Sequence, residues 1–117
     1  KETLGSEWRQ YETIFPAIAG SNIDQVSLEY RNSRVPGELM SLLAGKDIMV
    51  GVIDVATQEV ETAEDVARTI ESATRFVPAE RLLPCTNCGM APMPRAVASA
   101  KLRALGAGSR IARERFA

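Results

Sequence analysis

The chain alternates short, mostly apolar runs with longer segments of helical periodicity. The apolar runs lie at residues 26–30, 48–53 and 81–83. The second run is almost continuously apolar, which is typical of a strand that is covered on both faces. Successive runs are separated by roughly 25 to 35 residues, the spacing of consecutive right-handed βαβ units. This pattern predicts three parallel strands joined by helices.

The first helical segment spans residues 6–19. Ser6 is suited to its N-cap, and Pro16 inside the pattern predicts a kink or break near Phe15. The apolar residues at helical spacing, which we interpret as core, are Trp8, Tyr11, Ile14, Phe15 and Ile18.

Two further helices are predicted around the second strand. The first has Pro36 in its first turn and ends with Gly45 as C-cap. The next starts at Thr62, which forms an approximate capping box with Asp65. Its apolar stripe comprises Val66, Ile70, Ala73 and Phe76 or Val77, and we expect its solvated face to comprise Glu61, Glu64, Asp65, Arg68, Glu71 and Arg75.

A final helix of about 20 residues is predicted to run toward Arg115, with Gly106 and Gly108 weakening its middle. The alternation of helices and strands indicates an α/β fold with a parallel sheet. Three strands would leave two open sheet edges. If these are barrel units, most of the barrel is missing, because a complete (β/α)8 barrel needs about 250 residues.

Composition narrows the classes of function. The chain has 117 residues, a formal net charge of −1, two cysteines and no histidine. This charge gives no broad attraction for nucleic acid or an anionic membrane. No apolar run approaches the roughly 20 residues of a membrane span, and the first residues lack the apolar core of a signal peptide. We therefore expect a cytoplasmic protein. The absence of an initiator Met suggests a fragment of a longer protein.

Each predicted strand is followed by residues that can carry chemistry. Glu29 ends the first strand, Asp54 ends the second, and Cys85 and Cys88 follow the third. The carboxyl ends of parallel strands meet on one face, where sites are built. A carboxylate and a thiolate are competent zinc ligands, whereas the cysteines could also be a redox pair or inert thiols. On the pattern alone, the favoured interpretation of Glu29 is a solvated acid at a strand edge.

The order of several motifs resembles the C-terminal part of the cobalamin-independent methionine synthase family. These motifs are Val26-Ser27-Leu28-Glu29, Gly51-Val52-Ile53-Asp54, Pro78-Ala79-Glu80-Arg81-Leu82 and Asn87-Cys88-Gly89-Met90. The resemblance implies that residues 1–117 are a C-terminal fragment of a (β/α)8 catalytic domain. It also implies a zinc-dependent transfer of a methyl group, from a methylated folate, to a thiol such as homocysteine.

The resemblance assigns roles residue by residue. Glu29 matches the family's glutamate zinc ligand and Cys88 its last cysteine ligand. Asp54 matches an acid near the site, for which we expect a role in positioning the thiol substrate. Cys85 has no counterpart, and Asn87 replaces the usual Asp. No catalytic residue is assigned.

One family feature is missing. The His-x-Cys ligand pair that precedes the glutamate strand is absent from these residues. Either that strand lies upstream of Lys1, as the abrupt start favours, or the protein has lost the metal. We expect the 117 residues to be inactive without the rest of the barrel. The alternatives are a related barrel that alkylates another thiol, such as coenzyme M, and a non-catalytic α/β module.

Overall fold

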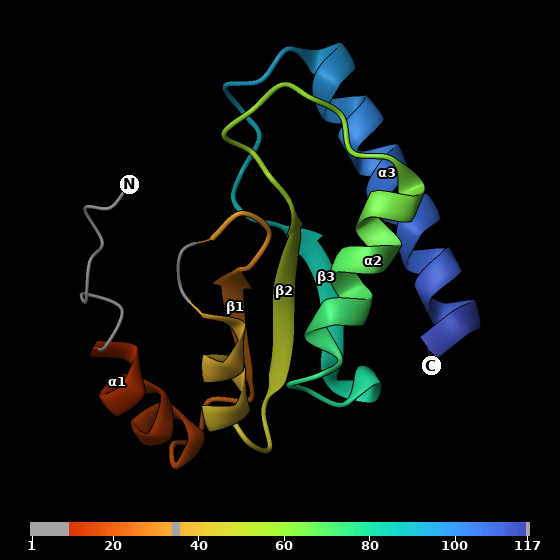
Figure 1. Ribbon diagram of the computed structural model, residues 1–117. Coiled ribbons are helices and arrows are strands. Elements are labelled where there is room, and N and C mark those ends of the chain that lie inside the picture. The colour runs from red at the N-terminus through yellow and green to blue at the C-terminus, as the bar shows by residue number, and fades with distance from the viewer. Residues whose placement is uncertain (1–9, 34–35, 117) are drawn as a thin grey trace.

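A parallel sheet forms the centre of the computed structural model, which describes residues 10–33 and 36–116 (Figure 1). Its strands, in the spatial order β1-β2-β3, are β1 (Gln25–Glu29), β2 (Asp47–Ile53) and β3 (Leu82–Thr86). The helices are α1 (Gln10–Ala19), α2 (Ala63–Ala73) and α3 (Arg95–Phe116), with short 3-10 helices η3 (Gly37–Leu42) and η4 (Ala79–Arg81). The predicted alternation of parallel strands with helices is confirmed.

One face of the sheet is covered by helices. Ile48, Val50 and Val52 of β2 are fully buried. Both α2 and α3 contact β2, and they also pack against each other (Figure 1). These three side chains alternate along the strand, so they point to the same face and form the centre of the core.

The opposite face of the sheet is largely open. The strand register places Glu29, Gly51 and Cys85 in one row across the three strands, and Ser27, Met49 and Leu83 in another. Of these residues, Ser27, Glu29 and Leu83 are exposed, while Met49 and Cys85 are half-buried. Within β2 itself, residues 50–53 are all buried and Met49 is half-buried, so the expectation that the second strand is covered on both faces is met along most of its length. A sheet covered on one side is the form of a section of barrel wall.

The N-terminal part of the helix layer differs in detail from the prediction. Helix α1 continues through Pro16, so the predicted break near Phe15 is wrong within the described residues. Phe15 is buried, as expected for a core residue, whereas Tyr11 and Ile14 are exposed, so the prediction that they belong to the core is wrong. Ser6 and Trp8 lie outside the described residues. A proline removes one backbone hydrogen bond from a helix, and α1 nevertheless continues to Ala19.

The connection from β1 to β2 is a 3-10 helix and not the α-helix that was predicted. Its buried residues are Leu39 and Met40. Gly45 does not cap it, because η3 ends three residues earlier at Leu42. Gly45 instead adopts a φ of +85° in the turn that leads into β2, a conformation that favours glycine.

The middle of the chain follows the prediction more closely. The Thr62 side chain accepts a hydrogen bond from the Asp65 backbone, and the Asp65 side chain accepts one from the Thr62 backbone, which completes the capping box. Helix α2 ends at Ala73, earlier than the predicted stripe. Strand β3 begins at Leu82 and runs on to Thr86. Cys85 therefore lies inside a strand, and only Cys88 lies beyond its end.

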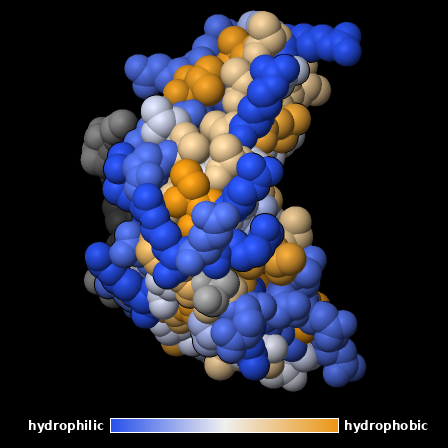
Figure 2. Space-filling model, turned by 90° about the vertical axis from the view of Figure 1, so that its right-hand side faces the viewer, coloured by the Kyte–Doolittle hydropathy of each residue, from blue (hydrophilic) through white to orange (hydrophobic). Residues whose placement is uncertain are grey.

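Helix α3 spans 22 residues, close to the predicted length. Figure 2 shows the side of the molecule on which α3 lies, where hydrophilic side chains are interspersed with hydrophobic patches. No helix in the described part of the chain is long and apolar enough to cross a membrane.

Gly108 allows the close contact between α3 and α2, because it has no side chain. A Cβ atom at Gly108 would lie 2.4 Å from Val66 Cβ and 2.7 Å from the Ala63 carbonyl oxygen. Gly106, two residues earlier, faces open space: apart from the neighbouring backbone of α3, no atom lies within 4 Å of such a Cβ. Gly108 therefore has a packing role that the predicted weakening of the helix did not include.

These two glycines give a matched pair of substitutions. We expect Gly108→Ala to destabilise the protein by about 1 to 3 kcal/mol, because the added methyl overpacks the helix contact. Gly106→Ala should stabilise it by up to about 1 kcal/mol through helix propensity. Urea denaturation of both variants measures the difference. Equal effects of the two substitutions would contradict the packing role of Gly108.

Candidate functional site

The carboxyl ends of the three strands bring the predicted site residues to one end of the sheet. Glu29 is the last residue of β1, Asp54 directly follows β2, and Cys88 lies two residues beyond β3. Glu29 and Cys88 are exposed, and Asp54 is partly exposed. The fold thus places two carboxylates and one thiol at the carboxyl end of the sheet.

Asp54 ties together the loops after β1 and β2. Its Oδ2 accepts a hydrogen bond of 2.8 Å from Asn32 Nδ2, and its Oδ1 accepts one of 2.8 Å from the Ala56 backbone. Burial raises the pKa of Asp54, but these hydrogen bonds, together with the charges of Lys101 and Arg31, outweigh it and lower the pKa below its ordinary value. Asp54 is therefore a carboxylate held in a fixed orientation at neutral pH.

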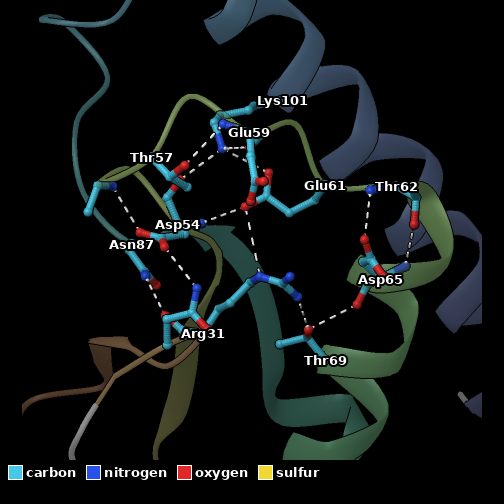
Figure 3. Close-up of polar contacts among 12 residues, drawn as sticks. Arg31, Asp54, Thr57, Glu59, Glu61, Thr62, Asp65, Thr69, Asn87 and Lys101 are labelled. Carbon is cyan, nitrogen blue, oxygen red and sulfur yellow. Dashed lines mark hydrogen bonds and ion pairs between the residues drawn. The ribbon is translucent and has the colours of Figure 1, made fainter.

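A buried lysine holds the loop that follows Asp54 (Figure 3). Lys101 comes from α3 and is fully buried. Its Nζ donates hydrogen bonds to the Asp54 carbonyl (2.9 Å), the Glu59 carbonyl (2.6 Å) and Glu61 Oε1 (3.0 Å). All three protons of the ammonium group are thereby used.

Glu61 completes this cluster from the other side. Its carboxylate is 4% exposed, and its Oε2 accepts a hydrogen bond of 2.9 Å from the Asp54 backbone. The prediction that Glu61 belongs to a solvated helix face is therefore wrong. Glu61 precedes the helix N-cap and turns inward, because Lys101 supplies the opposite charge that a buried carboxylate needs.

Arg31 and its neighbours form a polar pocket beside this cluster. Arg31 Nη1 donates to Thr69 Oγ1 at 3.0 Å, and its Nε lies 3.9 Å from Glu61 Oε2. The pocket has a volume of about 240 Å³ and lies between the loops that follow β1 and β2. It is lined by Arg31, Asn32, Asp54, Thr57, Glu59, Val60, Glu61 and Asp65.

The two cysteines have different surroundings, and neither forms a disulfide. Cys85 is half-buried, and burial raises the pKa of its thiol above the ordinary value, although a hydrogen bond with Ser27 opposes the rise. Cys88 is exposed in the loop, where its carbonyl oxygen accepts a hydrogen bond of 2.9 Å from Thr86 Oγ1. The accessible cysteine is thus the one that the resemblance assigned to a metal.

The donor chemistry of Glu29 and Cys88 fits zinc, which accepts carboxylate and thiolate ligands. Among the described residues, no group of three or more Cys, Asp or Glu side chains could hold a metal ion. A complete zinc site would therefore need ligands from outside the described residues.

Sequence reasoning missed Lys101 and the burial of Glu61. A signal for Lys101 was available, because it lies at helical spacing with the buried residues Ala104, Gly108 and Ala112 of α3. A lysine within an apolar stripe indicates a buried charge that must have a partner. The identity of that partner could not be read from the sequence, because Glu61 is 40 residues away.

Removing the lysine charge tests this cluster. We expect Lys101→Met to destabilise the protein by about 3 to 5 kcal/mol, because it leaves a buried carboxylate unpaired. The double variant Lys101→Met, Glu61→Gln should recover part of the loss, since the amide is neutral and can still accept the Asp54 hydrogen bond. Denaturation with urea measures both. A Lys101→Met protein as stable as the wild type would contradict the pairing.

Comparison with known proteins places this arrangement in a family. Residues 8–109 match the model of the cobalamin-independent synthase catalytic domain. The chain is 30% identical over 105 residues to the methionine synthase of Sulfurisphaera tokodaii, covering 90% of this chain and 31% of the relative. It is 43% identical over 67 residues to the 2-hydroxypropyl-CoM lyase of Xanthobacter autotrophicus, covering 57% of this chain and 18% of the relative.

A solved structure gives the same result. The B12-independent methionine synthase from Shewanella sp. W3-18-1, in complex with selenomethionine, superposes with a TM-score of 0.90 at 57% identity. The match covers 97% of this chain and 33% of that one, so the chain spans about a third of the length of such relatives. The predicted fold class, part of a (β/α)8 barrel, is confirmed. The chain belongs to the cobalamin-independent methionine synthase family, within its catalytic domain.

Proposed function

We propose that residues 1–117 form the C-terminal part of the catalytic domain of a zinc-dependent methyltransferase of methionine biosynthesis. The acceptor is a homocysteine-like thiol and the donor is a methylated folate. The observation that carries the proposal is the convergence of Glu29, Asp54 and Cys88 at one end of the sheet. The chain that forms this sheet matches the family over residues 8–109. The reduced thiols suit a cytoplasmic location.

Zinc is the metal that these residues would hold. Glu29 and Cys88 would be two of its ligands, and the rest of the barrel would supply the others. When bound, zinc lowers the pKa of a coordinated thiol, so that a thiolate is present at neutral pH. Cys85 is not proposed as a ligand, because it is half-buried within β3 and its pKa is raised by burial.

Asp54 would orient the thiol substrate. It lines the polar pocket, and its two hydrogen bonds fix the direction of its carboxylate while leaving further lone pairs for a ligand. The Lys101 and Glu61 cluster fixes the backbone on both sides of Asp54. A preorganised carboxylate of this kind can bind a cationic or hydroxyl group of a small molecule without reorganisation.

A second candidate function keeps the fold and changes the thiol. The similarity to 2-hydroxypropyl-CoM lyase, at 43% identity over 67 residues, favours coenzyme M as the alternative substrate. Two assays of the full-length protein, with the thiols at equal concentration, discriminate between the two: homocysteine with a methylated folate, and coenzyme M with an epoxide as the alkyl donor. Methyl transfer to homocysteine supports the first proposal, and reaction with coenzyme M alone supports the second.

Zinc content tests the proposed ligands. We expect about one zinc per chain in the full-length protein, and loss of most of it in Cys88→Ser, because a hydroxyl is a poor zinc ligand. Glu29→Gln should also weaken binding. Cys85→Ser is the matched control and should keep its zinc. The measurement is metal analysis after dialysis against a chelator. Full zinc in Cys88→Ser, or none in the wild type, would contradict the proposal.

The role of Asp54 is tested by kinetics. We expect Asp54→Asn to raise the KM for the thiol by about tenfold, a loss of about 1.4 kcal/mol in binding, with zinc content unchanged. Asp47→Asn is a suitable control, because Asp47 is exposed at the opposite end of β2. An unchanged KM in Asp54→Asn would show that this carboxylate does not contact the substrate.

A further inference from the structure

We propose that Asn87 is a positioning residue that fixes the separation of Glu29 and Cys88. The proposal rests on the proposed function, in which those two residues hold zinc. Glu29 ends β1 and Cys88 follows β3, and these strands are not neighbours because β2 lies between them. The separation of the two ligands therefore depends on contacts made to β2 and across it.

The Asn87 side chain makes that crossing. Its Oδ1 accepts a hydrogen bond of 3.2 Å from the Tyr30 backbone N–H. Its Nδ2 donates one of 2.9 Å to the Arg31 carbonyl oxygen, an interaction drawn in Figure 3. Tyr30 directly follows Glu29, and Asn87 directly precedes Cys88. A single amide therefore joins the backbone beside one proposed ligand to the backbone beside the other.

Gly51 of β2 makes room for this amide. A Cβ atom at Gly51 would lie 2.0 Å from Asn87 Oδ1 and 2.9 Å from Asn87 Cα. Any larger residue would displace Asn87, because the contact includes backbone. This explains the glycine in the middle of the row formed by Glu29, Gly51 and Cys85.

The two backbone segments that Asn87 joins, after β1 and after β3, are also hydrogen-bonded to β2. The Arg31 N–H donates to the Gly51 carbonyl at 2.8 Å, and the Asn87 N–H donates to the Ile53 carbonyl at 2.9 Å. Consecutive Cα atoms are about 3.8 Å apart, so fixing Tyr30 and Asn87 also confines Glu29 and Cys88. Groups hydrogen-bonded to metal-ligating side chains typically change metal affinity by about 10- to 100-fold, and a backbone bridge beside the ligands should act in the same direction.

The chemistry of the amide matters as well as its position. Tyr30 N–H can only donate and the Arg31 carbonyl can only accept, so the bridging group needs both an acceptor and a donor. An amide has both, whereas a carboxylate could accept from Tyr30 but would face the Arg31 oxygen without a proton. Asn87, which replaces the usual Asp of the family, thus makes a contact that an ionised Asp cannot make.

Zinc affinity of the full-length protein tests the positioning role. We expect Asn87→Ala to weaken zinc binding about 10- to 100-fold, measured by competition with a chelator, and Asn87→Asp to show a smaller loss. Binding of Co²⁺ should still give a sulfur-to-metal absorption band in both variants, because Cys88 is intact. Asn22→Ala is the matched control, since Asn22 is exposed in the turn before β1, and should bind zinc like the wild type.

Hydrogen exchange on the zinc-free protein separates this proposal from the proposed function. Asn87→Ala should speed exchange of the Tyr30 amide, because its acceptor is removed. Unchanged exchange, or an unchanged zinc affinity in Asn87→Ala when the wild type binds zinc, would overturn the positioning role and leave the function standing. A wild-type protein that binds no zinc would overturn both the positioning role and the proposed function. This holds even if faster exchange in Asn87→Ala shows that Asn87 bonds the Tyr30 amide.

Discussion

The buried ion pair between Lys101 and Glu61 constrains the whole site end of the molecule. Removing a charged group from water costs several kcal/mol unless its partners are all in place. Lys101 finds these partners in two loop carbonyls and one carboxylate, so the loop from Asp54 to Glu61 has little freedom to take another path. The same carboxylate receives the Asp54 N–H. Helix α3, although remote in sequence, thereby sets the conformation of the loop after β2.

Close backbone approach is the second constraint, and two glycines permit it. Gly108 lets α3 pack against Val66 of α2, which brings Lys101 of the same helix to its partners. Gly51 lets the Asn87 side chain pass across β2. The first glycine acts on the covered face of the sheet and the second at its carboxyl end. Together they connect the packing of the helices to the geometry of the strand ends.

The sequence predicted features that depend on local pattern. The almost continuous apolar run of β2 and the Thr62 and Asp65 capping box are encoded by neighbouring residues, and both appear in the structure. The path through Pro16 and the 3-10 form of η3 were not predictable, because tertiary packing overrides local preference there. The role of Asn87 depends on atoms 56 and 57 residues away, which no local pattern records. The positions of Glu29 and Cys88 at the strand ends follow from the topology, whereas their metal binding stays a prediction.

The span of the Lys101 contacts also has a consequence for the order of folding. Pairing of β1, β2 and β3 can proceed from one βα unit to the next, as each strand finds the strand before it. The loop after β2 cannot be fixed at that stage, because Lys101 Nζ reaches the Asp54 carbonyl across 47 residues. Such non-local contacts form late, since closing the intervening chain costs entropy before the contact forms. Docking of α3 is therefore the step that fixes the loop beside Asp54, and it can follow the pairing of the strands.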